Sequence, residues 1–326
     1  MKILVTGGAG YIGSNMVLAL LDAGHQPVIL DDFSTGHEQL VPDGVEVIRG
    51  NVGDRAVTDA LFAAHKFDAV AHFAASIVVP ESVADPLKYY LNNTISTARL
   101  IAACVDHGIT KFVFSSTAAV YGNQDQSPIS ETAQPTPENP YGTSKLMSEN
   151  ILRDVAAAHD FSYVVLRYFN VAGADPKGRS GQLSKPATHL IKVAVELATG
   201  QRDNMQIFGT DYPTDDGTCV RDYIHITDLI GAHMAALDYL IAGGTPLTAN
   251  CGYGRGSSVR DVLESVARVA GKNLNVTEAE RRAGDAADLV ANASLLRSKL
   301  GWQPEYDALD TIVGDALAWE RANVPE

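Results

Sequence analysis

Two side chains four residues apart, Tyr141 and Lys145, form the pair in this 326-residue sequence that is best suited to moving a proton. Asn139 and Pro140 precede them and predict the start of a helix, on which positions i and i+4 share one face. A free phenol, with a pKa near ~10, is a poor base at neutral pH, but a neighbouring lysine cation favours the phenolate. We therefore expect Tyr141 to act as an acid and base and Lys145 to tune it, although this spacing alone usually marks only a surface helix.

Three glycines, Gly7, Gly10 and Gly13, follow the first predicted strand and open the first predicted helix. Their GxxGxxG spacing is a variant of the dinucleotide-binding fingerprint, in which backbone N–H groups at a helix start face a pyrophosphate. Gly7 permits the tight turn, Gly10 allows the close approach of the phosphates, and Gly13 allows the helix to pack on the strand. The strand before and the helix after make this reading more specific than the glycines alone.

The second predicted strand ends in two carboxylates, Asp31 and Asp32, at the offset expected of a ribose-binding acid. A carboxylate there accepts hydrogen bonds from both ribose hydroxyls and repels a 2′-phosphate, so the sequence predicts NAD rather than NADP. A solvated turn explains Asp32 well and Asp31 less well. Thr117 follows the fifth predicted strand, where it can hydrogen-bond the same hydroxyl as Tyr141.

These side chains require a parallel sheet to bring them together, and the first half of the sequence predicts one. Short apolar, β-branched runs at residues 2–6, 27–31, 45–49, 69–73, 111–115 and 162–168 alternate with helical patterns at 12–23, 55–65, 86–107 and 141–159. This alternation predicts an α/β Rossmann-type doubly wound parallel sheet. We expect residues 1–170 to form the NAD-binding domain and 171–326 mainly a smaller substrate-binding region, with later segments able to return to the sheet.

The composition is that of an ordinary soluble protein and disfavours some partners. A formal net charge of −14 disfavours nucleic acid and anionic membranes, and no segment approaches the ~20 apolar residues of a membrane span. The three cysteines (Cys104, Cys219 and Cys251) are far apart and show no metal-ligand spacing, so we expect reduced thiols, no metal site and a cytoplasmic location.

Seven stretches together resemble the extended short-chain dehydrogenase/reductase superfamily and, within it, the UDP-galactose 4-epimerases. They are TGGAGYIGS, HFAASIVVPESV, FVFSSTAAVYG, NPYGTSK, LRYFNVAGA, IFGTDYPTDDGTCVRDYIH and RRAGD. The last three are typical of enzymes that act on nucleotide sugars. The resemblance spans nearly the whole chain.

The resemblance implies reversible 4-epimerisation of UDP-galactose and UDP-glucose through a transient 4-keto sugar, with NAD retained through the cycle. Tyr141 would remove the proton of the sugar 4-hydroxyl while hydride passes from C4 to NAD, Lys145 would bind the nicotinamide ribose, and Thr117 would assist. The implied NAD site comprises Gly7, Gly10, Tyr11, Ile12, Gly13, Asp31, Asp32, Asn51, Val52, Phe73, Ala74, Ala75, Asn93, Tyr141, Lys145 and Phe169. Asn51 stands where many relatives carry aspartate.

The implied UDP-sugar site comprises Thr117, Asn170, His189, Leu190, Gln206, Phe208, Arg221, Arg282, Asp285 and Leu289. Two arginines can clamp a diphosphate despite the negative net charge, although each alone could equally form a surface ion pair. His189 stands where some relatives have asparagine. Leu289 matches a position that gates the sugar 2-substituent, and its size favours UDP-glucose and UDP-galactose over N-acetylated sugars.

Several alternatives remain at this point: a 4-epimerase of UDP-N-acetylhexosamines or UDP-pentoses, and a non-catalytic NAD-binding regulator. A 4,6-dehydratase is disfavoured because Ala118 and Ala119 occupy the place of its Asp-Glu pair, and nothing distinctive points to a decarboxylase. A dehydrogenase with freely exchanging cofactor is disfavoured by the nucleotide-sugar motifs. His225 is more consistent with a packed core histidine than with a catalyst. By the same resemblance, the long helices around residues 86–107 and 141–159 predict a homodimer.

Overall fold

The computed structural model describes residues 1–183, 187–282 and 285–323. Within this part of the chain, seven parallel strands form one sheet: β1 (Lys2–Thr6), β2 (Gln26–Asp31), β3 (Glu46–Arg49), β4 (Ala69–His72), β5 (Lys111–Ser115), β6 (Ser162–Tyr168) and β11 (Leu247–Cys251). Their order is β11-β6-β5-β4-β1-β2-β3. The direction of strand addition reverses between β1 and β4, and ligands of such sheets bind outside the carboxyl ends of the strands at this point.

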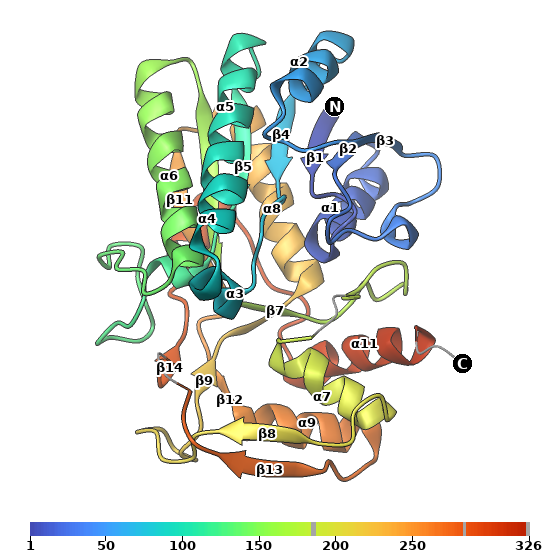
Figure 1. The fold of residues 1–326 in the computed structure, drawn as a ribbon, viewed down its shortest axis with the longest axis vertical. Coiled ribbons are helices and arrows are strands. Elements are labelled where there is room, and N and C mark those ends of the chain that lie inside the picture. Colours follow the sequence, from blue (N-terminus) through green and yellow to red (C-terminus); the bar gives the residue numbers. More distant parts are fainter. Residues whose placement is uncertain (184–186, 283–284, 324–326) are drawn as a thin grey trace.

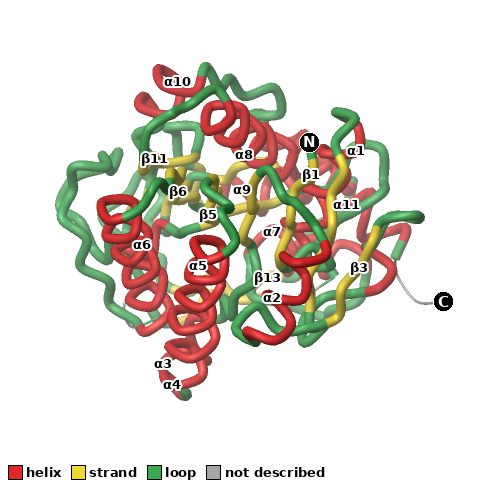
Figure 2. The backbone as a smooth tube through the Cα atoms, turned by 90° about the horizontal axis from the view of Figure 1, so that it is seen from above, coloured by secondary structure: helices red, strands yellow, loops and turns green. Residues whose placement is uncertain are grey.

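Helices cover both faces of the sheet (Figure 2). α1 (Tyr11–Asp22), α8 (Ile226–Ile241) and α10 (Ser294–Leu300) lie on one face, and α2 (Arg55–Ala64), α5 (Ser96–Asp106) and α6 (Pro140–Ala158) lie on the other. Side chains alternate between the faces along each strand, so Ile3 and Val5 join the first core while Leu4 joins the second. Burial on both faces explains why the strands read as continuous apolar runs.

The helical region that follows β4 is more divided than the sequence predicts. In place of one helix over residues 86–107, α3 (Val79–Ala84) and α4 (Pro86–Tyr89) precede a π-helical stretch, Tyr90–Ile95, which runs into α5. Asp85 separates α3 from α4 and caps α4, because its Oδ1 accepts from the Lys88 N–H at 3.3 Å. The prediction was correct in that residues 86–106 are helical, and wrong in that they form three segments with different hydrogen-bonding patterns instead of one α-helix. The helix α3 was not predicted.

A smaller set of elements lies beyond the carboxyl ends of the strands (Figure 1). β8 (Met205–Phe208) pairs with β13 (Val276–Ala279), β9 (Val220–Arg221) lies between β12 (Ser257–Ser258) and β14 (Asp288–Leu289), and β7 (Asn170–Ala172) pairs with β10 (Tyr223–His225). α7 (Leu190–Thr199), α9 (Val259–Ala270) and α11 (Leu309–Ala322) pack on one another. The chain returns to the main sheet through α8, β11 and α10.

The predicted fold class, a doubly wound parallel sheet, is confirmed. The six predicted strands match β1 to β6 to within one residue at each end. Among the residues that the structure describes, no helix is both long enough and apolar enough to cross a bilayer.

Candidate active site

The end of β5 and the start of α6 form the centre of the candidate site. Asn139 caps α6, since its Oδ1 accepts from the Gly142 N–H at 2.9 Å, and Pro140 occupies the first turn. A Cβ at Gly142 would lie 2.4 Å from the carbonyl oxygen of Ala119. Glycine at this position therefore allows α6 to pack closely on the turn that follows Thr117.

Tyr141 is 7 % exposed, and its side chain lies beside that of Thr117. Burial raises the pKa of the Tyr141 phenol to about 12, while the neighbouring Thr117 side chain acts in the opposite direction. The ring of Tyr89 packs edge-on at 6.3 Å between centroids. Tyr141 thus needs added positive charge before its phenol can ionise at neutral pH.

Lys145 supplies positive charge one helical turn further along α6. Lys145 is 3 % exposed, and its ammonium donates to the backbone oxygen of Ser115 at 2.9 Å and lies 4.9 Å from the centre of the Phe114 ring. Burial lowers the pKa of Lys145 to about 8, and the nearby carboxylate of Glu149 opposes this shift. The ammonium form therefore still predominates at pH 7.

The glycine turn has the shape that a dinucleotide pyrophosphate requires. Gly7 has φ +69°, and a Cβ there would lie 2.7 Å from the Ala74 nitrogen. A Cβ at Gly13 would lie 2.1 Å from the Gly7 carbonyl oxygen. The first helical hydrogen bond of α1 runs from Ser14 N–H to Gly10 O at 2.9 Å, and the Gly10 N–H is bonded to Gly7 O. The amides of Tyr11, Ile12 and Gly13 are therefore those available to an anion.

The two carboxylates after β2 have different surroundings. Asp31 is buried and accepts from the Ala9 N–H at 2.9 Å and the Phe33 N–H at 2.8 Å, and its pKa is raised by burial. Partial burial acts against Asp32, but hydrogen bonds from Ser34 and Asn51 hold its pKa below the usual range. The Asn51 amide donates to Asp32 at 3.0 Å and its oxygen accepts from the Gly53 N–H at 2.9 Å.

The other predicted NAD residues follow the carboxyl ends of neighbouring strands, so the sheet brings them to one edge. Asn93 is buried and joins two of these segments, because its amide nitrogen donates to Ser76 O at 2.9 Å and to Ser144 Oγ at 3.0 Å. The Tyr11 hydroxyl donates to Gly173 O at 2.7 Å. The remaining members are Ile12 in α1, Val52 after β3, Phe73, Ala74 and Ala75 after β4, and Phe169 after β6.

Five of the predicted substrate residues form two groups in the smaller part of the fold. Leu289 of β14 pairs with Arg221 of β9, and the Arg221 guanidinium lies 3.9 Å from Asp285 Oδ1. Arg282 lies over the ring of Phe208 at 3.7 Å. Residues 283 and 284 of the RRAGD motif lie outside the described residues.

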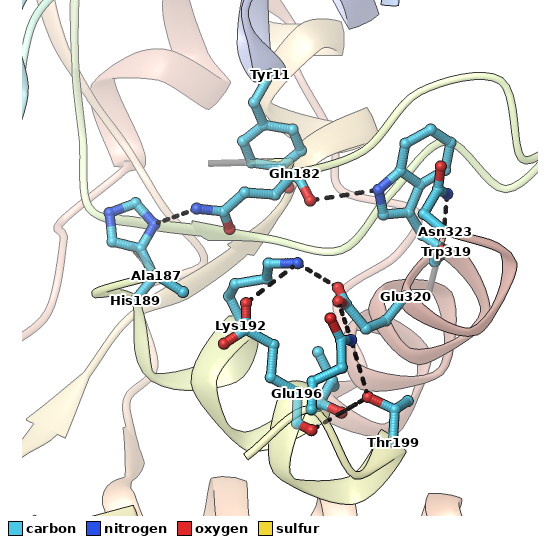
Figure 3. Close-up of polar contacts among 12 residues, drawn as sticks. Tyr11, Gln182, Ala187, His189, Lys192, Glu196, Thr199, Trp319, Glu320 and Asn323 are labelled. Atoms are coloured by element: carbon cyan, nitrogen blue, oxygen red, sulfur yellow. Dashed lines mark hydrogen bonds and ion pairs between the residues drawn. The ribbon is translucent and has the colours of Figure 1, made fainter. Parts of the chain in front are cut away.

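The remaining predicted substrate residues lie on other elements. Gln206 is exposed on β8, and Asn170 begins β7. His189 immediately precedes α7, which begins at Leu190, and its Nδ1 lies 3.4 Å from the side-chain nitrogen of Gln182 (Figure 3). His225 is buried; its Nδ1 accepts from the Thr227 N–H at 3.0 Å, capping α8, and its Nε2 lies 3.1 Å from Asp315.

Sequence reasoning missed three buried side chains beside the centre of the site: Ser116, Glu149 and Arg167. Glu149 lies one further turn along α6 from Lys145, so continuing the spacing of four residues could have found it. Nothing local in the sequence pairs it with Arg167, whose Nε donates to Glu149 Oε1 at 3.0 Å from the neighbouring strand β6.

The sheet order and the glycine turn are those of a dinucleotide-binding protein, and the buried tyrosine–lysine pair lies at the carboxyl edge of the sheet. Residues 3–252 match the model of the NAD dependent epimerase/dehydratase family. UDP-glucose 4-epimerase of Azospirillum brasilense is 54% identical over 98% of this chain and 92% of its own length.

Solved structures agree with these sequence matches. UDP-glucose 4-epimerase of Brucella ovis, in complex with NAD, is similar with a TM-score of 0.95 and 43% identity, covering 97% of each chain. The UDP-Glc/GlcNAc 4-epimerase of Campylobacter jejuni is similar with a TM-score of 0.87 and 47% identity, covering 98% of this chain and 99% of its own. The chain therefore belongs to the NAD dependent epimerase/dehydratase family, which confirms the predicted relationship.

Proposed function

We propose that this protein is an NAD-dependent UDP-glucose 4-epimerase, which interconverts UDP-galactose and UDP-glucose through a transient 4-keto sugar. The observation that carries the proposal is the buried arrangement of Thr117, Tyr141 and Lys145 at the carboxyl edge of the sheet. Full-length similarity to UDP-glucose 4-epimerases supports the choice of reaction.

The residues around the glycine turn fit NAD. The close contact between α1 and the turn leaves no space for a Cβ at Gly13, and the first amides of α1 are available to a pyrophosphate. Asp31 and Asp32 suit the two hydroxyls of an adenosine ribose and disfavour a 2′-phosphate. When bound, NAD supplies the acceptor and donor of hydride for C4 of the sugar.

The protein side chains control the proton. Tyr141 accepts the proton of the 4-hydroxyl as a phenolate and returns it at the end of the cycle. Lys145 stabilises that phenolate by its charge, because the ammonium is fixed by Ser115 O in a dry environment. Thr117, which lies beside Tyr141, orients the same hydroxyl.

The substrate assignment uses the smaller part of the fold, and we propose residues 171–326 as mainly the UDP-sugar side and residues 1–170, with α8 and β11, as the NAD side. Arg221 and Arg282 are suited to the diphosphate, and Phe208 offers an apolar face beside it. The partly buried Leu289 packs against the cluster that contains Phe169. A leucine there leaves less space for a sugar 2-substituent than a small residue does.

We also propose a homodimer, formed through the exposed side of α4 to α6. Leu87, Leu91 and Ile95 are spaced four residues apart and are 68%, 57% and 42% exposed, and Met147 on α6 is 42% exposed. Apolar side chains concentrated in this way mark an interaction surface, and a two-fold axis would bury them against their copies. Light scattering at micromolar concentration tests this, since a monomer mass would refute it.

The buried, unpaired cysteines suit the reducing cytoplasm that we assign.

The decisive experiment gives purified protein UDP-galactose without added NAD and follows UDP-glucose by chromatography. The wild type should interconvert the two sugars, and Tyr141→Phe should be slower by orders of magnitude. Reaction only with UDP-N-acetylglucosamine or a UDP-pentose would refute the assigned sugar and leave the mechanism. No reaction with any nucleotide sugar, even with added NAD, would favour a non-catalytic NAD-binding regulator.

A further inference from the structure

One buried face of α6 carries three polar residues in succession, Tyr141, Lys145 and Glu149. Because they are four residues apart, they point toward the same neighbour, the end of β5. Tyr141 lies beside Thr117, Lys145 donates to Ser115 O at 2.9 Å, and Glu149 Oε1 accepts from Ser116 Oγ at 2.5 Å. Three consecutive residues, the last of β5 and the two that follow it, thus contact three successive turns of α6.

Glu149 is also half of a buried ion pair. The Arg167 Nε donates to its two carboxylate oxygens at 3.0 and 3.2 Å, and Arg167 Nη2 lies 2.5 Å from Oε2. The Arg167 guanidinium stacks on the Tyr121 ring at 4.8 Å, and the Tyr121 hydroxyl donates to Asn250 at 2.7 Å. Ser116 and Arg167 therefore fix the carboxylate one turn from Lys145, and Tyr121 packs against the Arg167 guanidinium.

We infer that Glu149 and Arg167 are positioning residues that set, through Lys145, the pH range in which Tyr141 can take and return a proton. The inference rests on the proposed function, since it assigns these residues to the same proton transfer. Neither is expected to touch the substrate.

The charges decide the direction of the effect. Lys145 and Arg167 carry +1 each and Glu149 carries −1, so the group has a net charge of +1, which a Tyr141 phenolate balances. Loss of the Glu149 charge raises the sum to +2 and weakens proton binding by Tyr141 and Lys145 together. Other titratable or charged groups near the cluster are His72, Tyr89, Glu131, Arg153, Asp154, Tyr163 and Tyr168.

The test is the pH profile of epimerisation in three variants. Glu149→Gln should move both limbs of the profile to lower pH by about half to one unit. Glu149→Gln/Arg167→Gln restores the sum of +1, so its profile should return toward the wild-type position. Glu149→Asp keeps the charge and should keep the position of the profile, even where the rate falls.

Breaking a buried ion pair also destabilises the fold, so a matched control is needed. Lys192 on α7 and Glu320 on α11 form another buried ion pair, with Glu196 3.5 Å from the same ammonium (Figure 3). Glu320→Gln should lower the unfolding temperature without moving the pH profile. Circular dichroism of each variant shows whether it is folded.

A second readout does not depend on turnover. The ultraviolet absorbance change of tyrosinate formation, taken as the part lost in Tyr141→Phe, should titrate at lower pH in folded Glu149→Gln than in the wild type. The inference would be overturned if Glu149→Gln lowered the rate of epimerisation without shifting either its pH profile or the tyrosinate titration. The Glu149–Arg167 ion pair would then have a structural role only. An inactive wild type would instead overturn the proposed function, and the tyrosinate titration would then still decide the electrostatic coupling.

Discussion

Gly13→Ala tests whether the close contact between α1 and the glycine turn serves NAD. The added Cβ would lie 2.1 Å from Gly7 O and 2.8 Å from Gly7 C, both backbone atoms. Ordinary contacts begin above about 3 Å, so α1 must move by roughly 1 Å, and overpacking of this kind costs about 1–3 kcal/mol. Alanine gains about 1 kcal/mol of helix propensity, which offsets only part of this cost.

Retention of NAD should suffer more than the fold. A displacement of roughly 1 Å misaligns the amides that face the pyrophosphate, and the loss of one charge-assisted hydrogen bond, about 1.5–3 kcal/mol, lowers the affinity at least tenfold. NAD released from purified protein and NAD titration measure this effect. Gly314→Ala in α11 is the matched control, because an added Cβ there would point into open space, so stability should rise slightly and NAD binding stay unchanged. Wild-type NAD affinity in a folded Gly13→Ala protein would refute the reasoning.

Three further predictions concern single side chains. Asp31→Asn should weaken NAD binding and lower the ratio of NAD affinity to NADP affinity, measured by titration with each dinucleotide. An unchanged affinity ratio would contradict the assigned ribose contact. Lys145→Met should lower kcat by about 10²-fold or more. In the wild type, kcat should fall as the pH rises through about 8, because Lys145 loses its proton there. A wild-type kcat that stays constant up to about pH 9 would contradict this role of Lys145. His72 and His233 are buried and neutral, with pKa values lowered by burial to about 3 and about 4, so the unfolded chain binds more protons below pH ~6.5. The free energy of unfolding measured with urea should therefore be lower at pH 5 than at pH 7, by about 1–2 kcal/mol per histidine. Equal free energies of unfolding at the two pH values would refute the prediction that these histidines are neutral in the folded protein.

The elements that the sequence predicts well are those whose cause is local. The strands around Ile3 and Val113 are buried on both faces, so unbroken apolar runs mark them and each boundary falls within one residue. Asn139 and Pro140 mark the start of α6 in the same direct way. The π-helical stretch from Tyr90 has no such signal, because helical propensity does not distinguish a hydrogen bond to the fourth residue from one to the fifth.

What the sequence predicts less well depends on which strands become neighbours. Arg167 belongs to β6 and Glu149 to α6, eighteen positions apart, and they meet only because β6 lies beside β5 under that helix. The roles assigned to Tyr141, Thr117 and the other site residues remain predictions. The structure adds that the polar contacts of α6 with β5 extend one turn beyond the residues that the motif names.

The charge distribution explains how a protein with a net charge of −14 can hold a substrate that is itself negative. Within the part of the chain that the structure describes, the carboxylate paired with Arg221 is that of Asp285, at 3.9 Å. This distance is beyond a hydrogen bond, so the pair is not a bidentate one of the kind that Arg167 makes. Arg282 lies over an aromatic face, which orients the planar cation without occupying its N–H donors. The N–H donors of these two arginines can bind a diphosphate at short range. At that range their attraction outweighs the repulsion from the protein's net negative charge, which salt screens within about 8 Å. The net negative charge would then act mainly against longer polyanions such as nucleic acid. A few local arginines are therefore compatible with both the expected absence of such partners and the proposed substrate.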